Sequence, residues 1–327
     1  MHATRRTLAA LFGALTLLGA LPQAHAQAFP SRPVRVIVPY PPGGTVDVLA
    51  RAMAPELSTL WGQPVVIDNV SGAGSVIGAE RAANAAPDGH TLMATVNPTV
   101  VSNRFLFKKL PYDPDKSFAP VSMIAQSGQF IFAHPSLQAN TLKELVELAR
   151  REPGKIAYAS FGNGSQPQQL FETLAKRENV KFLHVPYKGI APATTAVVAG
   201  EVMLSVASAA QAGALIKAGK LKALSLGAAK RMAAFPDVPT SAEAGYPYAV
   251  ASVWLGFFAP GATPPALVER LQRDMATVAR KPEFAERHIT GRGFDLVAST
   301  PAEFAAALRA ETELVGEMIR AAGIQPE

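Results

Sequence analysis

Residues 34–45 have the sequence VRVIVPYPPGGT, and this stretch of the 327-residue chain decides the fold. Val34–Val38 is an apolar run of strand length, and the loop that follows it contains Pro, Tyr, Gly and Thr. The next residues carry apolar side chains at the spacing of one helix face: Val46, Leu49, Met53, Leu57 and Leu60. A strand, a turn and an amphipathic helix in this order predict the repeating unit of a parallel α/β sheet.

The same alternation of strand and helix continues along most of the chain. Further strands are predicted at residues 65–68, 91–96, 129–133, 156–160, 182–185, 202–207 and 221–226. Helix starts are predicted by the capping-box pairs Thr141/Glu144, Thr240/Glu243 and Thr300/Glu303, and by Thr263-Pro264-Pro265. We therefore expect an α/β protein in which mostly parallel sheets are flanked by helices.

The length of the chain indicates two domains, at roughly 150 residues for each. Residues 109–121 are rich in Pro and Asp and form either an interdomain crossing or a long surface loop. The apolar run at residues 253–259 follows a segment rich in Pro and Gly and is a candidate return crossing. If both segments cross, the second domain is inserted into the first, and the two lobes have a cleft between them.

The N-terminus has the three parts of a secretory signal peptide. Arg5 and Arg6 precede an apolar stretch at residues 8–21, and Ala24-His25-Ala26 is a small-x-small cleavage site. The apolar stretch is too short to span a bilayer. We expect cleavage after Ala26, or alternatively after Ala28, by Sec export or, given the paired arginines, by twin-arginine export. An exported chain without cysteine is expected in a bacterial periplasm.

Composition excludes several classes of function. The lack of cysteine excludes disulfide scaffolds, iron–sulfur clusters and cysteine nucleophiles. Loss of Arg5 and Arg6 with the leader lowers the net charge from +6 to +4, and the remaining bases are scattered, so no nucleic-acid partner is expected. No histidine beyond the leader has a partner at metal-ligand spacing, so no metal is expected.

Enzymatic motifs are missing as well. The chain has no Gly-x-Ser-x-Gly, no His-Glu-x-x-His and no Ser-x-x-Lys helix start with its companion motifs. Gly72-x-Gly74-x-x-x-Gly78 is only a weak match to a dinucleotide fingerprint, because no acidic residue ends the next predicted strand. We therefore expect neither an enzyme nor a cofactor.

Three glycine loops each lie between a predicted strand and a predicted helix, at residues 39–45, 69–75 and 160–165. The first N–H groups of a helix have no partner within the helix, and glycine lets a ligand approach them. The helix dipole favours negative charge at the same place. Three such loops predict a site for a small anion at the carboxyl ends of the strands.

Acidic residues near these loops have simpler interpretations. Asp47 lies in the first turn of the helix after residues 39–45 and is expected to complement the helix dipole. Asp113 and Asp115 lie in the proline-rich stretch and are expected to form a solvated turn. The sequence thus predicts binding elements without catalytic groups.

A series of short motifs, in their order along the chain, resembles one known family. The motifs are Ser31-Arg32-Pro33-Val34, residues 38–47, Gly62-Gln63-Pro64-Val65-Val66, Gly72-Ala73-Gly74, residues 87–92 (PDGHTL), Leu110-Pro111-Tyr112-Asp113, Phe118-Ala119-Pro120-Val121, residues 153–160 (PGKIAYAS), His184-Val185-Pro186-Tyr187-Lys188-Gly189, Ala218-Gly219-Lys220-Leu221, residues 236–240 (PDVPT) and Glu243-Ala244-Gly245. On these motifs the chain resembles the Bug (TctC-like) family, the periplasmic solute-binding proteins of tripartite tricarboxylate transporters. The resemblance covers essentially the whole chain beyond the leader.

This resemblance implies a two-lobed, type II-like Venus-flytrap protein that closes on a small carboxylate. The leader would be residues 1–26, lobe 1 residues 27–125 and 248–327, and the inserted lobe 2 residues 126–247. The implied partners are the carboxylate and the membrane permease subunits of a tripartite transporter, and we expect a monomer. Alternatively, the protein reports its bound carboxylate to a signalling receptor without transport; a periplasmic enzyme is the third hypothesis.

The resemblance also implies which residues bind the ligand, through backbone groups and ordered waters. Lobe 1 would contribute Tyr40, Pro42, Gly43, Gly44, Thr45, Ser71, Gly72, Gly74, Ser75 and Asn97. Lobe 2 would contribute Ser160, Gly164, Ser165, Tyr187, Lys188 and Ala207.

Two departures from the family pattern bear on specificity. The family usually has Asp where this chain has Met203 and again near Ala207, and a histidine-containing helix start where this chain has Gln166-Pro167-Gln168. An acid near the cleft would pair with an ammonium group of the ligand. Without it, we expect amino acids to bind less tightly than plain dicarboxylates or aromatic carboxylates.

Overall fold

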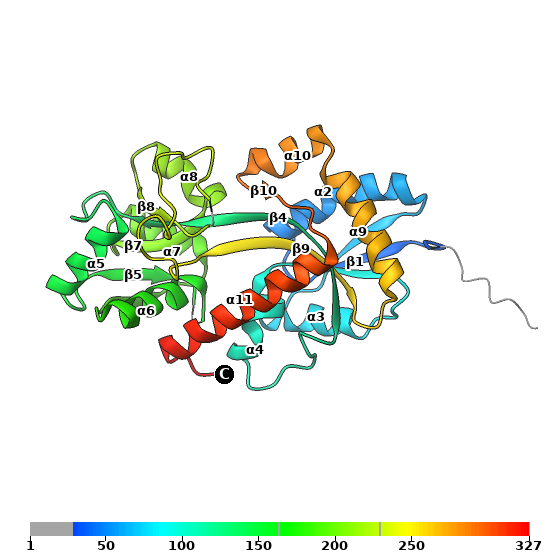
Figure 1. The fold of residues 1–327 in the computed structure, drawn as a ribbon, viewed down its shortest axis with the longest axis horizontal. Coiled ribbons are helices and arrows are strands. Elements are labelled where there is room, and N and C mark those ends of the chain that lie inside the picture. Colours follow the sequence, from blue (N-terminus) through cyan, green and yellow to red (C-terminus); the bar gives the residue numbers. More distant parts are fainter. Residues whose placement is uncertain (1–28, 163, 229, 327) are drawn as a thin grey trace, which may run out of the picture.

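The computed structural model of the chain describes residues 29–162, 164–228 and 230–326. Helices cover a curled mixed sheet that extends through two lobes (Figure 1). The predicted leader, with cleavage after Ala26 or Ala28, lies outside the described residues. Within those residues, no helix has the length and apolar character needed to cross a membrane.

Lobe 1 is the part of the molecule built on three parallel strands. These are β1 (Val34–Val38), β2 (Val65–Asn69) and β3 (Thr91–Thr95), with β1 between the other two. The helices of this lobe are α2 (Thr45–Trp61), α3 (Val76–Ala83), α4 (Asn103–Leu106), α9 (Pro265–Ala279) and α10 (Pro282–His288). Short helical turns η2 (Ala73–Ser75), η3 (Pro98–Ser102) and η4 (Thr290–Arg292) connect them.

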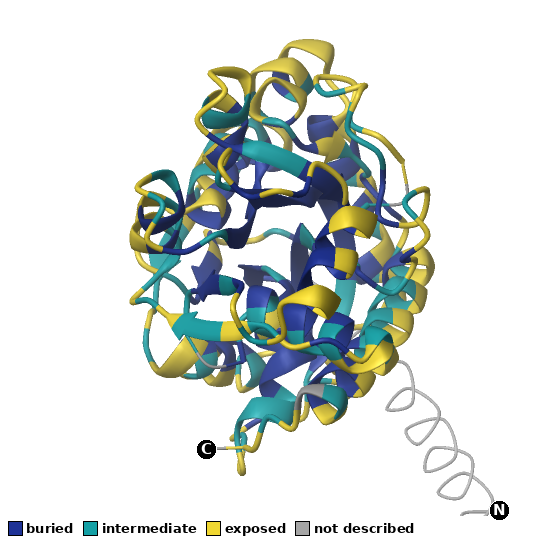
Figure 2. Cartoon of the chain, turned by 90° about the vertical axis from the view of Figure 1, so that its left-hand side faces the viewer, coloured by how far each residue is buried: buried dark blue, intermediate teal, exposed yellow. Residues whose placement is uncertain are grey.

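Lobe 2 repeats this plan on a second set of strands. They are β5 (Ala157–Ser160), β6 (Leu183–Pro186), β7 (Leu204–Ser208) and β8 (Lys222–Leu226). β5 pairs in parallel with β6 and β7. The helices are α5 (Leu142–Arg151), α6 (Gln166–Glu178), α7 (Ile190–Val198) and α8 (Ala209–Lys217). Figure 2 looks at this lobe and shows buried residues on the inner strands and exposed residues on the outer helix faces.

Two long strands connect the lobes. β4 (Phe118–Ala133) pairs antiparallel with β9 (Ser252–Pro260) over its first part and with β7 and β8 over its last part. β3 pairs antiparallel with β9, and the short β10 (Asp295–Leu296) pairs with β4. The strand order is therefore β2-β1-β3-β9-β4-β7-β5-β6. This pairing directs the carboxyl ends of the parallel strands of both lobes toward the middle of the molecule.

The last helix, α11 (Pro301–Ala322), contacts both lobes (Figure 1). Phe304, Val315 and Ile319 belong to a buried cluster of lobe 1. Met318 belongs instead to a buried cluster of lobe 2, where Leu314 also packs. Glu317 lies 3.7 Å from Arg177 of α6, so a charge pair adds to this contact. α11 therefore links the two lobes outside the crossing strands.

The predicted α/β class with a two-lobed arrangement is confirmed, and several elements differ in detail. Residues 129–133 are only the last part of the 16-residue β4. The hydrogen bonds of a capping box form between Thr240 and Glu243, but turns rather than a helix follow them. Leu60, predicted on the buried face of α2, is 49% exposed. The boundaries after residues 125 and 247 stay predictions.

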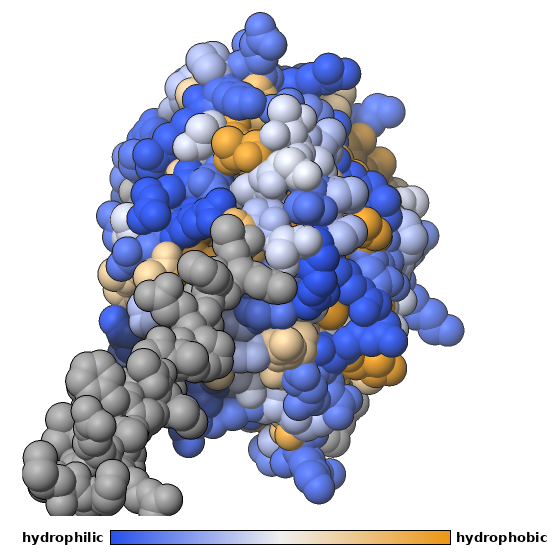
Figure 3. Space-filling view, turned by 90° about the vertical axis from the view of Figure 1, so that its right-hand side faces the viewer, coloured by the Kyte–Doolittle hydropathy of each residue, from blue (hydrophilic) through white to orange (hydrophobic). Residues whose placement is uncertain are grey.

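The surface of lobe 1 that points away from lobe 2 is largely hydrophilic. Figure 3 looks at this face and shows apolar residues only in small, separate patches outside the part covered by grey atoms. The core lies inside, where the apolar residues of the sheet and the helices form buried clusters in each lobe.

Candidate functional site

The glycine loops of the two lobes face each other because the parallel strands of both lobes end in the middle of the molecule. The loop at residues 39–44 follows β1, and residues 96–97 follow β3. From lobe 2, residues 161–165 follow β5 and residues 187–189 follow β6. Gly164 and Leu106 are so close that a Cβ atom on Gly164 would lie 2.5 Å from Leu106 Cδ2. The loops thus form a cleft in which the lobes touch.

The first cleft cavity, of about 470 Å³, has walls from both lobes. Five predicted site residues line it: Tyr40, Gly74, Asn97, Gly164 and Ser165. Residues that the sequence reasoning did not select also line it: Val96, Pro98, Ser102, Asn103, Leu106, Phe107, Phe161, Gln166, Gln169, Val253, Ile324 and Gln325. Within the described part of the chain, this lining contains no charged side chain. An anion here would be held by amide and hydroxyl groups.

The second cleft cavity, of about 580 Å³, also lies between the lobes. The start of α2 provides Gly43 and Thr45, both predicted site residues, and α8 provides Ala209 and Lys217. His288 at the end of α10, Arg292 of η4 and the adjoining Gly293 also line it. This end of the cleft therefore carries the cationic side chains that the first cleft cavity does not have.

A hydrogen-bonded chain of hydroxyl groups fixes the lobe 1 loops. The Tyr40 hydroxyl lies 3.0 Å from Thr99 Oγ1, and Thr99 in turn donates to Ser75 Oγ at 2.9 Å. Asn103 Nδ2 donates to the Gly74 carbonyl at 2.9 Å. Burial raises the pKa of Tyr40, although its hydrogen bonds oppose the rise, so the phenol is neutral. Three separate segments are held together at one wall of the first cleft cavity.

Asp47 organises the loop after β1. Its Oδ2 accepts a 2.8 Å hydrogen bond from the Gly43 amide, and its Oδ1 accepts from Arg51 and Asn69, each at 2.9 Å. Asn69 also donates to the Tyr40 carbonyl at 3.1 Å. Burial works against ionisation of Asp47, but these hydrogen bonds prevail and lower its pKa. Asp47 therefore connects the glycine loop to β2, in addition to lying where it can complement the dipole of α2, as expected.

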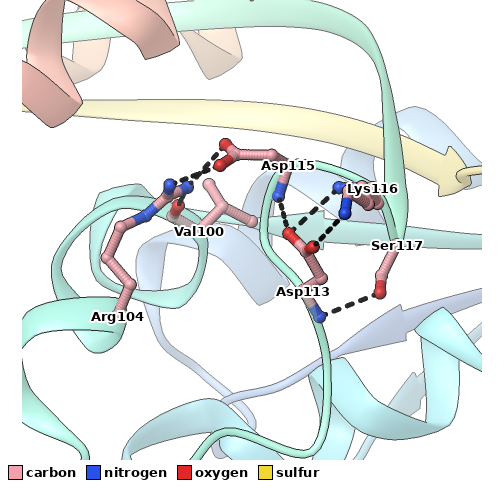
Figure 4. Close-up of polar contacts among 6 residues, drawn as sticks. All are labelled: Val100, Arg104, Asp113, Asp115, Lys116 and Ser117. Atoms are coloured by element: carbon pink, nitrogen blue, oxygen red, sulfur yellow. Dashed lines mark hydrogen bonds and ion pairs between the residues drawn. The ribbon is translucent and has the colours of Figure 1, made fainter.

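Arg104 fixes α4, which provides Asn103 and Leu106 to the first cleft cavity (Figure 4). Its guanidinium makes two hydrogen bonds to Asp115, at 2.7 and 2.9 Å, and one to the Val100 carbonyl. Asp113 accepts from the Asp115 amide at 2.9 Å, so this carboxylate shapes the turn. The turn is exposed, as expected, and Arg104 also ties it to α4.

The lobe 2 loop is held by its own side chains. Ser165 Oγ donates to the Gly162 carbonyl at 2.6 Å, and Gln168 Oε1 accepts from the Gly164 amide at 2.7 Å. Ser160 Oγ lies 2.6 Å from His184 Nε2. Burial lowers the pKa of His184, although Glu172 opposes this effect, so the imidazole is neutral at pH 7. Ser160 is fully buried, and in this arrangement no substrate reaches its hydroxyl.

The remaining predicted site residues line neither cavity. Pro42, Gly44, Ser71 and Lys188 are exposed, while Gly72 and Tyr187 are half-buried. Ser75, Ser160 and Ala207 are buried. A direct role of these residues in ligand binding stays a prediction. Among the described residues, no group of three or more His, Cys, Asp or Glu side chains could hold a metal ion.

The lining residues that were not predicted differ in whether a nearby sequence pattern could have indicated them. Gln166 was named for its bearing on specificity but was not selected as a ligand-binding residue, and Gln169 lies in the same first turns of α6, directly after a glycine loop. Ile324 and Gln325 follow α11, far along the sequence from every glycine loop. No local pattern places them in the first cleft cavity.

Comparison with known proteins gives consistent matches over most of the chain. Residues 49–324 match the family described as "Tripartite tricarboxylate transporter family receptor". A relative from Pseudomonas sp. (strain P51), described as "UPF0065 protein in tcbD-tcbE intergenic region", is 36% identical over 311 residues, covering 94% of this chain and 91% of that protein.

Two similar solved structures contain carboxylates. R. palustris Rpa4515, solved with adipate, is 30% identical, with a TM-score of 0.77 over 91% of this chain and 100% of that chain. MatC of Rhodopseudomonas palustris, solved with bound malate, is 32% identical, with a TM-score of 0.73 over 89% of this chain and 100% of that chain.

Proposed function

The chain belongs to the tripartite tricarboxylate transporter receptor family, and from this premise we propose that it captures a small carboxylate between its lobes and delivers it to a membrane transporter. The observation that carries the proposal is the first cleft cavity, which the loops of both lobes line together. A ligand that contacts both walls binds the closed arrangement better than the open one, and so shifts the equilibrium toward closure.

The lining of the first cleft cavity supports a ligand with a carboxylate and an apolar body. The Gln166 side-chain amide, which donates one N–H to the Ser252 carbonyl and has a second, suits the carboxylate, whereas Leu106, Phe107 and Phe161 suit hydrocarbon. The adipate and malate found in the two R. palustris proteins are small dicarboxylates. The described lining offers no carboxylate to an ammonium group, so amino acids are expected to bind less tightly.

A thermal-shift screen with adipate, malate, aromatic acids and amino acids tests binding. A ligand present at 100 times its Kd adds about 2.7 kcal/mol of stability, which is a readily measured rise in Tm. A flat response across all four classes would overturn the proposal. Isothermal titration with aspartate and glutamate then tests the order of affinities, and tight binding of either would contradict it.

Delivery to a transporter needs a separate test. We propose that the protein works as a monomer in the periplasm and that the closed form docks on permease subunits. A strain that lacks the protein should lose uptake of the radiolabelled ligand and regain it with the restored chain. If the protein binds the ligand but uptake is unchanged, reporting to a signalling receptor replaces transport as its role.

A further inference from the structure

Glu311, in the middle of α11, joins three parts of the molecule. Its Oε2 accepts a 2.6 Å hydrogen bond from the Trp254 indole nitrogen, and its Oε1 accepts from the Asn97 side-chain amide. The side-chain oxygen of Asn97, Oδ1, in turn accepts a 3.2 Å hydrogen bond from the Trp254 backbone amide. The three residues form a closed ring of hydrogen bonds between α11, the end of β3 and the crossing strand β9.

The chemistry of this ring admits only one kind of group at position 311. The indole nitrogen can only donate, and the Asn97 amide is oriented by the bond that its carbonyl accepts. Two donors therefore point at Glu311, and a carboxylate supplies an acceptor oxygen to each. Burial raises the pKa of Glu311 against the lowering effect of Trp254 and Asn97. Burial thus opposes ionisation of Glu311, and the two hydrogen bonds offset part of that effect.

The ring lies directly behind the first cleft cavity. Asn97 is buried and lines that cavity together with its neighbours Val96 and Pro98. Val253, next to Trp254, lines it from the crossing strand. Glu311 itself is not among the lining residues. Its contacts therefore act on the wall of the cavity through Asn97 and Trp254.

We propose that Glu311 is a positioning residue for ligand binding: it sets Asn97 and the crossing strand β9 in the arrangement that forms the first cleft cavity. This inference rests on the proposed function. Because α11 packs on both lobes, the ring also ties the cavity wall to the helix that links them. A ligand that needs this wall in place binds less tightly when the ring is broken.

The test exchanges donors and acceptors within the ring. In Glu311→Gln, an NH2 group replaces one carboxylate oxygen, so either the Trp254 indole or the Asn97 amide faces a donor instead of an acceptor. In Asn97→Asp, the new carboxylate faces the carboxylate of Glu311. In the double variant, the new amide at position 311 donates to the new carboxylate at position 97. The carbonyl of that amide accepts from Trp254, so each donor of the ring again faces an acceptor. Glu313→Gln, on the same helix, is the matched control because Glu313 is exposed and has no part in the ring or in the interlobe contacts described above.

Isothermal titration with adipate and with malate measures the effect. Each single variant should bind about tenfold more weakly than the wild-type protein, because a buried polar group loses its partner. The control should match the wild type. The double variant places a carboxylate in the wall of the cavity, so its ring is followed by the emission of Trp254 and not by the affinity for an anion. Urea unfolding separates the two roles, because a positioning role predicts weaker binding by a Glu311→Gln protein that is still fully folded, whereas a purely structural role would lower only the free energy of unfolding.

The outcomes separate this inference from the proposed function. If the wild-type protein binds no acid of the screen, the proposed function fails, and this inference fails with it; an aromatic acid that binds replaces adipate and malate in the titration. If the wild type binds and Glu311→Gln binds equally well, only this inference is overturned. Failure of the Trp254 emission to return in the double variant also overturns it, even where a single variant folds poorly. In a Trp61→Phe background, the emission of Trp254, then the single tryptophan, should shift in Glu311→Gln and return in the double variant.

Discussion

The backbone amide of Gly43 donates a 2.8 Å hydrogen bond to the side chain of Asp47, four residues further along the chain. A backbone donor of the glycine loop that precedes α2 is therefore already occupied by a carboxylate of the protein itself. The loop after β1 is shaped before any ligand arrives, and the ligand has to use other groups of the cleft. Pre-ordered loops lose less conformational entropy when a ligand binds.

Asp47→Asn should lower the free energy of unfolding by about 1–3 kcal/mol, because the buried side chain loses its charge-assisted bonds to Arg51 and Gly43. The pKa of Asp47 is lowered, so its contribution is present above the ordinary value of 3.8 and is lost as the pH falls through the lower folded value. Urea unfolding at pH 7 measures the first effect. Asp237→Asn, at an exposed position, should stay within about 0.5 kcal/mol, and an equal loss there would contradict the assignment.

Gly164→Ala should weaken ligand binding by keeping the lobes apart. The new Cβ would lie 2.5 Å from Leu106 Cδ2 across the cleft, and the φ of +72° adds backbone strain. We expect about a tenfold loss of affinity for adipate or malate by titration calorimetry. The double variant with Leu106→Ala removes the clash but keeps the strain, so it should regain part of this loss. No difference between the single and double variants would rule out the steric explanation.

His184→Gln should make stability less sensitive to mild acid. Burial lowers the pKa of His184, so the unfolded chain takes up a proton at a higher pH than the folded one. The wild-type protein therefore loses stability as the pH falls through 6.5 toward the folded value. Urea unfolding at pH 7.5 and 5.5 should show a smaller difference in the variant. The pKa of His288 is also lowered, mainly by burial. Part of the loss of stability in mild acid therefore remains in His184→Gln until His288→Gln is added.

Ala207→Asp tests the expectation that an acid at this point would recognise an ammonium group. Ala207 is fully buried and belongs to a cluster with Phe130 and Leu226. A carboxylate there would be unpaired, so we expect a loss of several kcal/mol of unfolding free energy and no gain in amino-acid binding.

Ser208→Asp is the matched control, because residue 208 is the N-cap of α8 and Asp is a preferred cap. Its stability should stay within about 1 kcal/mol of the wild type. A stable Ala207→Asp protein that binds aspartate would show that this side chain faces the ligand after all.

Local patterns in the sequence predicted the elements that depend on neighbours in the chain. β1 and the start of α2 follow from residues 34–45, and the Thr300/Glu303 capping box begins α11 as expected. The first part of β4 was missed because Pro120, Ser127 and Gly128 interrupt its apolar pattern. Its strand conformation comes from pairing with β9, more than a hundred residues away in sequence.

The same distinction applies to the candidate site. Glycine loops are visible in the sequence because the conformation of glycine is a local property. The bonds of Ser160 to His184, and of Asn97 to Glu311, join residues that are far apart along the chain. No periodicity or spacing predicts such pairs, because only the completed sheet brings them together.

The division of each core among distant segments also determines when the protein can fold during synthesis. One core cluster of lobe 1 combines Val36 of β1 with Leu255 of β9 and Leu271 of α9, and a cluster of lobe 2 includes Met318 of α11. A ribosome releases these segments long after β1. This lobe 1 cluster is complete only after α9 has emerged, whereas another cluster of lobe 2 lies entirely within residues 130–238. Domains generally fold as units during synthesis, so the inserted lobe 2 can begin to fold while lobe 1 still waits for its C-terminal segments.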